Sequence, residues 1–111
     1  MKIVSLSQLE TTSVSHNPKI GKKTLLSYGE LGPITNLSQA VFPVGEVAGE
    51  HSHADMAEVF MINSGVGVIV VDGKEYPLSA GVCVVVSPHE RHEIRNTGVA
   101  ELVVTYFGVK M

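Results

Sequence analysis

Short apolar segments closed by turn residues are the feature of this sequence that most constrains its fold. The segments are rich in valine and end at Gly, Pro, Asn or Asp, as around residues 66–71 and 82–86. No apolar run at helical spacing extends beyond about two turns. Strand-like segments that recur about every 8 to 12 residues, with turns between them, are typical of a β-sandwich or small barrel. The sequence therefore predicts an all-β fold.

The pattern predicts nine strands. They are Ile3–Leu9, Lys23–Tyr28, Leu37–Val44, Glu58–Ile62, Val66–Val71, Lys74–Leu78, Val82–Val86, His92–Arg95 and Glu101–Phe107. The clearest turn is Asp72-Gly73, because a two-residue type I′ turn needs positive φ and this pair adopts it readily. A β-hairpin is therefore expected there.

Composition excludes several classes of protein. A length of 111 residues fits one domain, and a net charge of −3 with one weak lysine cluster argues against partners such as nucleic acid or an anionic membrane. The cluster, Lys19, Lys22 and Lys23, is expected on a solvated strand edge. The single cysteine, Cys83, cannot form an intramolecular disulfide and is expected to be buried as a small hydrophobe. With no secretory segment and no apolar run of membrane-spanning length, a cytoplasmic protein is expected.

Two histidines one residue apart, His51 and His53, stand in the segment GEVAGEHSHADMAEVFMINSG (45–65). Residues i and i+2 of an extended strand point to the same face, so the two imidazoles can reach one cation. Glu58 then begins the next strand and can supply a third donor. His92 and Asn96 are four residues apart, which places both on one face of a later strand.

Isolated histidines more often have a structural role. A single His on an apolar strand is usually a hydrogen-bonded core residue, and HxH recurs by chance. Here a carboxylate, two framing glycines and a second histidine segment accompany the pair. Three imidazoles and one carboxylate converging inside a β-barrel are typical of a site for Fe, Mn, Ni, Cu or Zn. Four protein ligands on an octahedral ion would leave two positions for water, oxygen or substrate.

These residues resemble the two motifs of a small, single-domain cupin. The first motif, G-x5-H-x-H-x(3,4)-E-x6-G, is matched by Gly45, His51, His53, Glu58 and Gly65. The second, G-x5-P-x-G-x2-H-x3-N, is matched at its overall spacing by Gly81, His92 and Asn96. Pro88 is displaced by one residue, and His89 stands where the family usually has glycine. Because glycine tolerates positive φ better than histidine, a turn of different shape is expected before His92.

The resemblance implies a double-stranded β-helix, a jelly-roll barrel of two antiparallel sheets with a metal ion near its wider mouth. By similarity, the metal ligands would be His51, His53, Glu58 and His92. One cupin domain would cover residues 1–111, with a core barrel at about 23–108. Residues 1–22 would form an edge strand and a contact in a homodimer, since small cupins commonly pair in this way and an exposed edge gains by pairing.

Pocket-lining candidates complete the expected site. Strand alternation can point Phe42, Phe60 and Tyr106 inward, although ordinary core packing explains such residues too. The other candidates are Asn96 and His89, of which His89 is either a proton shuttle at the mouth or a solvated turn residue. His16, far from the motifs, is expected on the surface.

Two functions remain open from the sequence. The first is a metalloenzyme acting on a small molecule, of oxygenase, isomerase or lyase type, since an open metal position can polarise or activate a bound group. The second is a non-catalytic module that binds or senses a metal or small ligand. Resemblance to a fold family does not choose between them.

Overall fold

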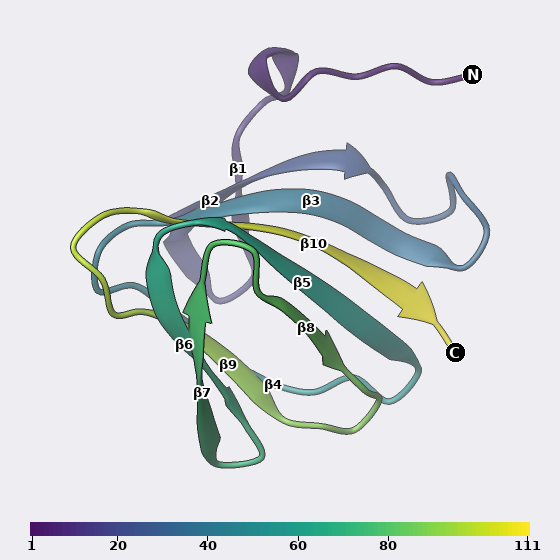
Figure 1. Cartoon of the computed structure of the whole chain (residues 1–111). Helices are drawn as coiled ribbons and strands as arrows, with labels where there is room; N and C mark the ends of the chain where they lie inside the picture. The colour runs from purple at the N-terminus through teal and green to yellow at the C-terminus, as the bar shows by residue number, and fades with distance from the viewer.

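The computed structural model describes all residues 1–111, and ten strands form two antiparallel sheets that face each other (Figure 1). The strands are β1 (Thr12–Val14), β2 (Asn17–Leu26), β3 (Ile34–Phe42), β4 (Val47–His51), β5 (Met56–Ser64), β6 (Val66–Val71), β7 (Lys74–Ser79), β8 (Cys83–Val86), β9 (His92–Asn96) and β10 (Leu102–Lys110). The all-β prediction and the two-sheet jelly-roll barrel are both confirmed.

Sequence neighbours are divided between the two sheets. The six-stranded sheet has the order β1-β2-β3-β10-β5-β8, and the four-stranded sheet has the order β4-β9-β6-β7. The chain therefore crosses between layers at β3–β4, β4–β5, β5–β6, β7–β8, β8–β9 and β9–β10. These crossings bring segments far apart in the sequence to the same part of the interior.

Alternation along the strands builds the core between the sheets. In β5, Glu58, Phe60 and Ile62 are buried, as predicted, and the residues between them face outward. The same period of two buries Leu102 and Val104 in β10. The eleven hydrophobic residues of the core are Ile20, Ala40, Phe42, Phe60, Ile62, Ile69, Leu78, Val86, Ile94, Leu102 and Val104.

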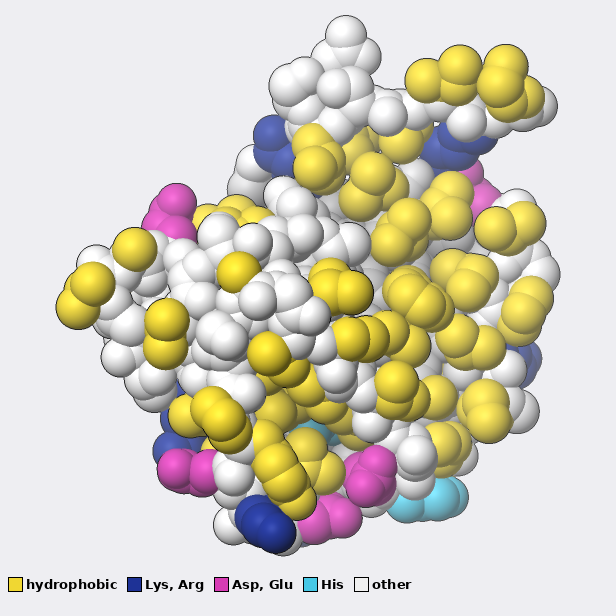
Figure 2. Space-filling view, viewed as in Figure 1, with side chains coloured by type: hydrophobic (Ala, Val, Ile, Leu, Met, Phe, Trp, Pro, Cys, Tyr) yellow, Lys and Arg dark blue, Asp and Glu magenta, His cyan; other side chains and the backbone are white.

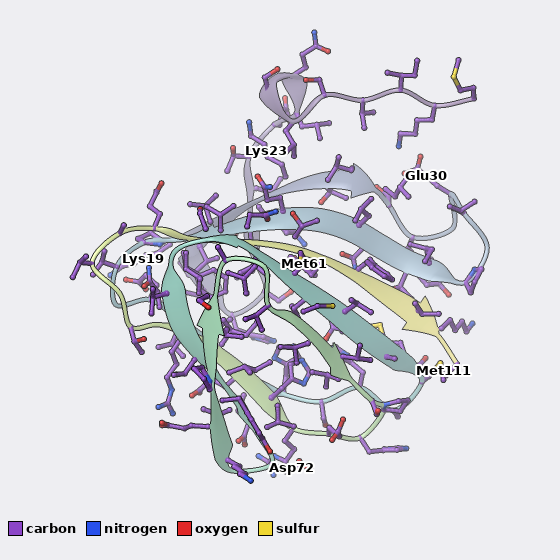
Figure 3. The ribbon with its side chains drawn as sticks, viewed as in Figure 1. Lys19, Lys23, Glu30, Met61, Asp72 and Met111 are labelled. Carbon is purple, nitrogen blue, oxygen red and sulfur yellow. The ribbon has the colours of Figure 1, made fainter.

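The predicted Asp72-Gly73 hairpin is confirmed. Asp72 and Gly73 have φ of 47° and 82°, the two positive values that a type I′ turn needs. Val71 pairs with Lys74 across this turn, so β6 and β7 are joined in register. Asp72 lies at the tip of the hairpin (Figure 3).

The strand predicted at Ile3–Leu9 is wrong. Leu6–Gln8 form one turn of 3-10 helix instead, and residues 1–10 pair with no strand. Alternating side chains favour a strand only where a neighbouring edge accepts its hydrogen bonds, and the edge of β2 is taken by β1. Since β2 begins at Asn17, the sheet also includes residues expected to lie outside the core barrel.

The expectation that Cys83 is buried is also wrong. Its side chain is exposed, because Val84 and Val86 of β8 face the core and Cys83 and Val85 lie on the opposite face. A run of four apolar residues on an edge strand hides this alternation from the sequence. The structure contains no helix with the length and apolarity needed to cross a membrane.

Candidate metal centre

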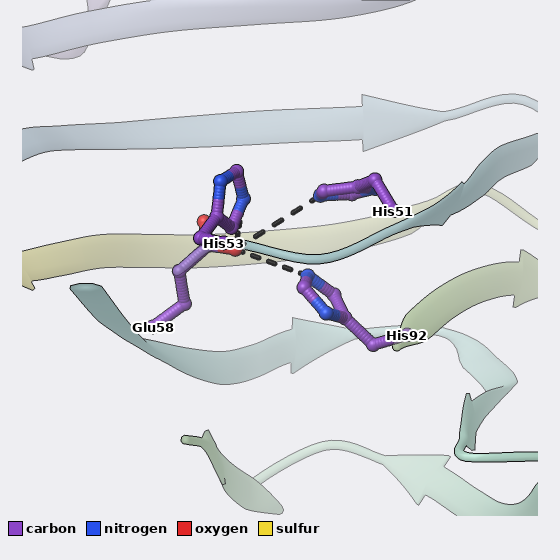
Figure 4. A group of neighbouring side chains, drawn as sticks. All are labelled: His51, His53, Glu58 and His92. Atoms are coloured by element: carbon purple, nitrogen blue, oxygen red, sulfur yellow. Dashed lines mark hydrogen bonds and ion pairs between the residues drawn. The ribbon is translucent and has the colours of Figure 1, made fainter. Parts of the chain in front are cut away.

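Four side chains predicted as metal ligands meet inside one end of the barrel (Figure 4). His51 ends β4 and pairs directly with His92, the first residue of β9, so both come from the four-stranded sheet. Glu58 comes from β5 of the six-stranded sheet, and His53 from the connection between β4 and β5. The two layers therefore contribute to one cluster.

A single carboxylate oxygen lies at the centre of this cluster. Glu58 Oε1 lies 3.0 Å from His92 Nε2 and 3.1 Å from His53 Nε2. His51 Nε2 is 3.9 Å away. One donor atom from each of the four residues lies within 4.8 Å of all the others.

Backbone carbonyls orient two of the imidazoles. His51 Nδ1 lies 2.9 Å from the Gly49 carbonyl oxygen, and His92 Nδ1 lies 3.1 Å from the Glu90 carbonyl oxygen. A carbonyl can only accept, so each Nδ1 carries the proton and donates it. In the neutral rings the Nε2 lone pairs therefore point toward Glu58, which is the arrangement of metal-binding histidines with their outer hydrogen bonds in place.

The cluster is graded from buried to open. Glu58 and His92 are 6% and 1% exposed, whereas His51 and His53 are partly exposed. Burial lowers the pKa of His92, but the hydrogen bonds to Glu58 and to the Glu90 carbonyl outweigh burial and raise the pKa above 6.5. The site thus attracts a positive charge at the buried end of the cavity.

The donor set fits a transition metal ion. Imidazole lone pairs and a carboxylate oxygen repel each other at about 3 Å unless a proton or a metal ion lies between them. Two donors about 2.1 Å from one ion, at right angles, lie about 3.0 Å apart, close to the two shorter Glu58 distances. Nitrogen and oxygen donors in this ratio suit Fe, Mn, Ni, Cu or Zn.

A cavity of about 420 Å³ opens beside the cluster. Phe42, Phe60 and Tyr106 line it, as predicted, and the rings of Phe60 and Tyr106 stack with centroids 5.7 Å apart. Burial, with a contribution from the negative charge of Glu58, raises the pKa of Tyr106 above 10. Tyr106 is therefore a neutral hydrogen-bond donor at physiological pH.

Asn96 does not line the cavity, contrary to expectation. It is buried, and its side-chain nitrogen donates to the carbonyl oxygens of Phe42 and Ala100, each at 2.9 Å. Its side-chain oxygen accepts the N–H of Gly98 at 3.0 Å. All these partners are backbone groups, so the amide holds the β9–β10 connection against the end of β3. The sequence places Asn96 on the correct face, but periodicity does not reveal which groups it bonds.

His89 does not line the cavity either. Its side chain is exposed, and its φ of 71° is the left-handed conformation that a glycine would favour. The expected change of turn shape is therefore absent at this residue, since histidine is among the residues that tolerate this region best. Its backbone N–H donates to the His53 carbonyl oxygen at 2.7 Å, which ties the turn to the segment that carries His53 of the cluster.

Two residues outside the predicted site contribute to the cavity wall, and one of them, His16, is exposed as expected. Lys22 of β2 and His16 of the β1–β2 turn both belong to its wall. Alternation from the buried Ile20 would have indicated the inward direction of Lys22, but the predicted strand began only at Lys23. No spacing rule links His16 to the motifs.

A family model described as "Cupin domain" matches residues 38–107. An oxalate-binding protein of Thermotoga maritima is 37% identical over 60 residues, which are 54% of this chain and 50% of that protein. The chain spans about half the length of the curated relatives it matches.

Solved structures share the fold. A predicted oxalate decarboxylase of Thermotoga maritima has a TM-score of 0.92 at 24% identity, with 99% of this chain and 100% of that chain covered. A sugar phosphate isomerase of the cupin superfamily from Silicibacter pomeroyi has a TM-score of 0.83 at 18% identity, with 99% and 76% covered. At these identities the likeness concerns the fold alone.

Proposed function

The chain belongs to the cupin family, and we propose that it binds one divalent transition metal ion and presents it to a small molecule in the adjoining cavity. The proposed ligands are His51, His53, Glu58 and His92. The observation that carries the proposal is the position of Glu58 Oε1, 3.0 and 3.1 Å from two imidazole nitrogens. The His92 Nε2 lone pair faces this oxygen because Nδ1 holds the ring proton, so the two atoms would repel each other unless a metal ion or a second proton lay between them.

Each part of the site has a distinct role in this proposal. A bound metal ion would supply Lewis acidity or, if it is redox-active, electron transfer to a group in an open coordination position. The Gly49 and Glu90 carbonyls keep the His51 and His92 rings oriented, so little reorganisation is needed when the ion binds. Phe60 and Tyr106 exclude water from one wall, and the Tyr106 hydroxyl can donate a hydrogen bond.

The favoured activity is that of a metal-dependent enzyme of small molecules, of oxygenase, isomerase or lyase type. A cavity of about 420 Å³ with an aromatic wall and convergent polar groups is of the size that holds metabolites. The oxalate-binding relative makes oxalate the first compound to test. Because that relative is described as binding oxalate, it also supports the alternative, a module that binds its ligand without converting it.

Metal content and turnover, measured on one preparation, test both levels of the proposal. Protein purified without chelators should contain about one transition metal ion per chain by mass spectrometry of the digested sample. Oxygen uptake and product formation are then followed with oxalate and a panel of small diketones, thiols and phenols. A chain that carries no metal and takes up no added Fe, Mn, Ni, Cu or Zn contradicts the proposal. Metal binding with ligand-dependent thermal shifts but no product favours the binding module.

We also propose that the chain forms a homodimer. Ile3 in the N-terminal segment is 81% exposed, and Val85 on the outer face of β8 is 62% exposed. Hydrophobic side chains gather over the six-stranded sheet and at the N-terminal segment (Figure 2). A second copy of the chain would cover both kinds of apolar surface. Light scattering should give twice the chain mass of 11.8 kDa, and a monomer mass contradicts this proposal.

A further inference from the structure

Lys22 points toward the metal side of the barrel. It pairs with Ala40, which is 1% exposed and part of the core, and paired residues of antiparallel strands share one face. Ile20, two residues earlier, is fully buried on the same face. Lys22 borders both the metal-side cavity and a groove on the outside of the sheet, and this register places its side chain on the inner side.

The next lysine in β2 faces the opposite way. Lys23 pairs with Gln39, and its Nζ donates to the Leu6 carbonyl oxygen at 2.8 Å, on the side of the N-terminal segment (Figure 3). Adjacent strand residues thus direct one lysine side chain toward the inner face of the sheet and the other toward the outer face. The inner lysine is a feature of the cavity rather than of a general basic surface.

The Lys22 ammonium group has no partner within the chain. The seven ion pairs of the structure do not include it, and no side-chain hydrogen bond involves it. Glu58 is the only acidic side chain in the cavity wall, and in the proposed function its charge is neutralised by the metal ion. A cavity that holds a divalent cation, one carboxylate and one lysine without an ion-pair partner has a net positive charge.

The β1–β2 turn adds polar groups to the same wall. Ser15 and His16 line the same cavity as Lys22, and His16 has a φ of 72°. A non-glycine residue in the left-handed region adopts an uncommon conformation, and here it places a histidine at the rim. The cavity wall therefore offers hydrogen-bond donors for anionic oxygens in addition to Lys22.

We propose that Lys22 determines specificity by binding a carboxylate of a small organic acid whose other end contacts the metal ion. The inference rests on the proposed function, which supplies the cation. Aromatic and aliphatic side chains of the same cavity wall, including Phe42, Phe60 and Val104, suit the short carbon chain that joins two acidic groups. The substrate or ligand class is thus a small organic acid with at least two oxygen-bearing ends, rather than a neutral sugar or an amine.

Calorimetry on zinc-loaded protein tests this inference. The probes are malonate, succinate and glutarate, each compared with its uncharged diamide. Wild type should bind at least one dicarboxylate and should bind the diamides much more weakly. In Lys22→Met the dissociation constant of that dicarboxylate should rise about tenfold to hundredfold, the loss expected for one hydrogen bond to a charged group. The matched control, Lys23→Met, removes the same charge from the outer face and should stay within about twofold of wild type.

Measuring the zinc content distinguishes failure of the metal proposal from failure of the proposed role of Lys22. Lys22→Met should retain one zinc ion per chain, because the lysine is not a proposed ligand. Wild type that binds zinc but takes up no dicarboxylate, binds the diamides equally well, or is insensitive to Lys22→Met overturns the role of Lys22 and leaves the metal proposal standing. Wild type that binds no zinc overturns both.

Discussion

The backbone N–H of His89 donates a hydrogen bond of 2.7 Å to the carbonyl oxygen of His53. The turn before β9 is therefore connected to the segment that carries one of the proposed ligands. His89 reaches this position with a φ of 71°, which costs free energy for any residue with a Cβ. The side chain itself is exposed, so the backbone of this residue, and not its imidazole, contributes to the site.

Replacing His89 separates the contribution of its backbone conformation from that of its imidazole. His89→Gly and His89→Ala both remove the imidazole, but only glycine adopts φ of 71° without steric cost. The glycine variant should therefore be more stable to urea than the alanine variant by about 1 kcal/mol. Both should retain the metal, since the N–H that bonds His53 is unchanged. Equal stability of the two variants would show that this turn relaxes to another conformation.

Removing two imidazoles should abolish metal binding. We expect His51→Ala combined with His53→Ala to reduce metal content from about one ion per chain to near zero, because only Glu58 and His92 remain. His89→Ala, an exposed histidine outside the cluster, is the matched control and should keep the wild-type content. A double variant that still binds one ion with wild-type affinity contradicts the ligand assignment.

The thermal shift caused by metal should grow as the pH rises from 6 to 8. The pKa of His92 in the folded, metal-free chain is raised above 6.5. A raised pKa means that protonated His92 stabilises the folded chain. This contribution is complete at pH values below the pKa of the unfolded chain and is lost as the pH rises through the pKa of the folded chain. Metal binding requires the neutral ring, so the metal-loaded form gains affinity over the same interval.

Scanning calorimetry of zinc-loaded and chelator-treated protein at several pH values measures this divergence. The chelator-treated curve should fall with pH from the contribution of this group, while the difference between the two curves widens. The His51→Ala, His53→Ala variant should show no widening. A constant difference in wild type would mean that protons and metal do not compete at His92.

Gly67 of β6 is expected to tolerate no side chain. A Cβ at this position would overlap the Arg95 carbonyl oxygen and lie 2.9 Å from Leu102 Cδ2. Gly67→Ala should therefore lower the free energy of unfolding by about 3 kcal/mol, because the neighbouring strand must move. Gly49→Ala in β4 is the control, since a Cβ there meets nothing within 4 Å, and it should change stability by less than about 0.5 kcal/mol. Urea unfolding of both variants measures the difference. Equal stability of the two variants would contradict the close contact of Gly67 with Arg95 and Leu102.

The sequence predicts most strands and the convergence of the histidines with Glu58 for definite physical reasons. Where a strand has one buried face, a period of two determines both the strand and its inward side, as for Glu58, Phe60 and Ile62. The hairpin at Asp72-Gly73 is predictable because its backbone conformation depends on two residues only. The convergence of His51 and His53 with His92 required the family motif, because local periodicity cannot show that two distant segments meet.

The secondary-structure predictions are wrong where tertiary contacts, and not the local sequence, determine whether a strand forms. Residues 3–9 alternate like a strand but pair with no edge of either sheet, and β4 forms without a clear apolar alternation because β9 lies beside it. The β1–β2 hairpin, which carries His16 to the cavity rim, also has no strong local signal. Such features depend on the neighbouring strand and not on the segment itself.

The origin of the proposed ligands in both layers has a consequence for folding. Glu58 and His92 are 34 residues apart in the chain and lie on opposite sheets. With one cysteine the chain has no intramolecular disulfide. An ion bound by both residues would therefore cross-link the two sheets and limit their separation. Loss of the ion restores the freedom of a long loop, which is an entropic gain for the unfolded chain. Amide hydrogens of β5 and β9 should therefore lose exchange protection together when the ion leaves, although they belong to different sheets.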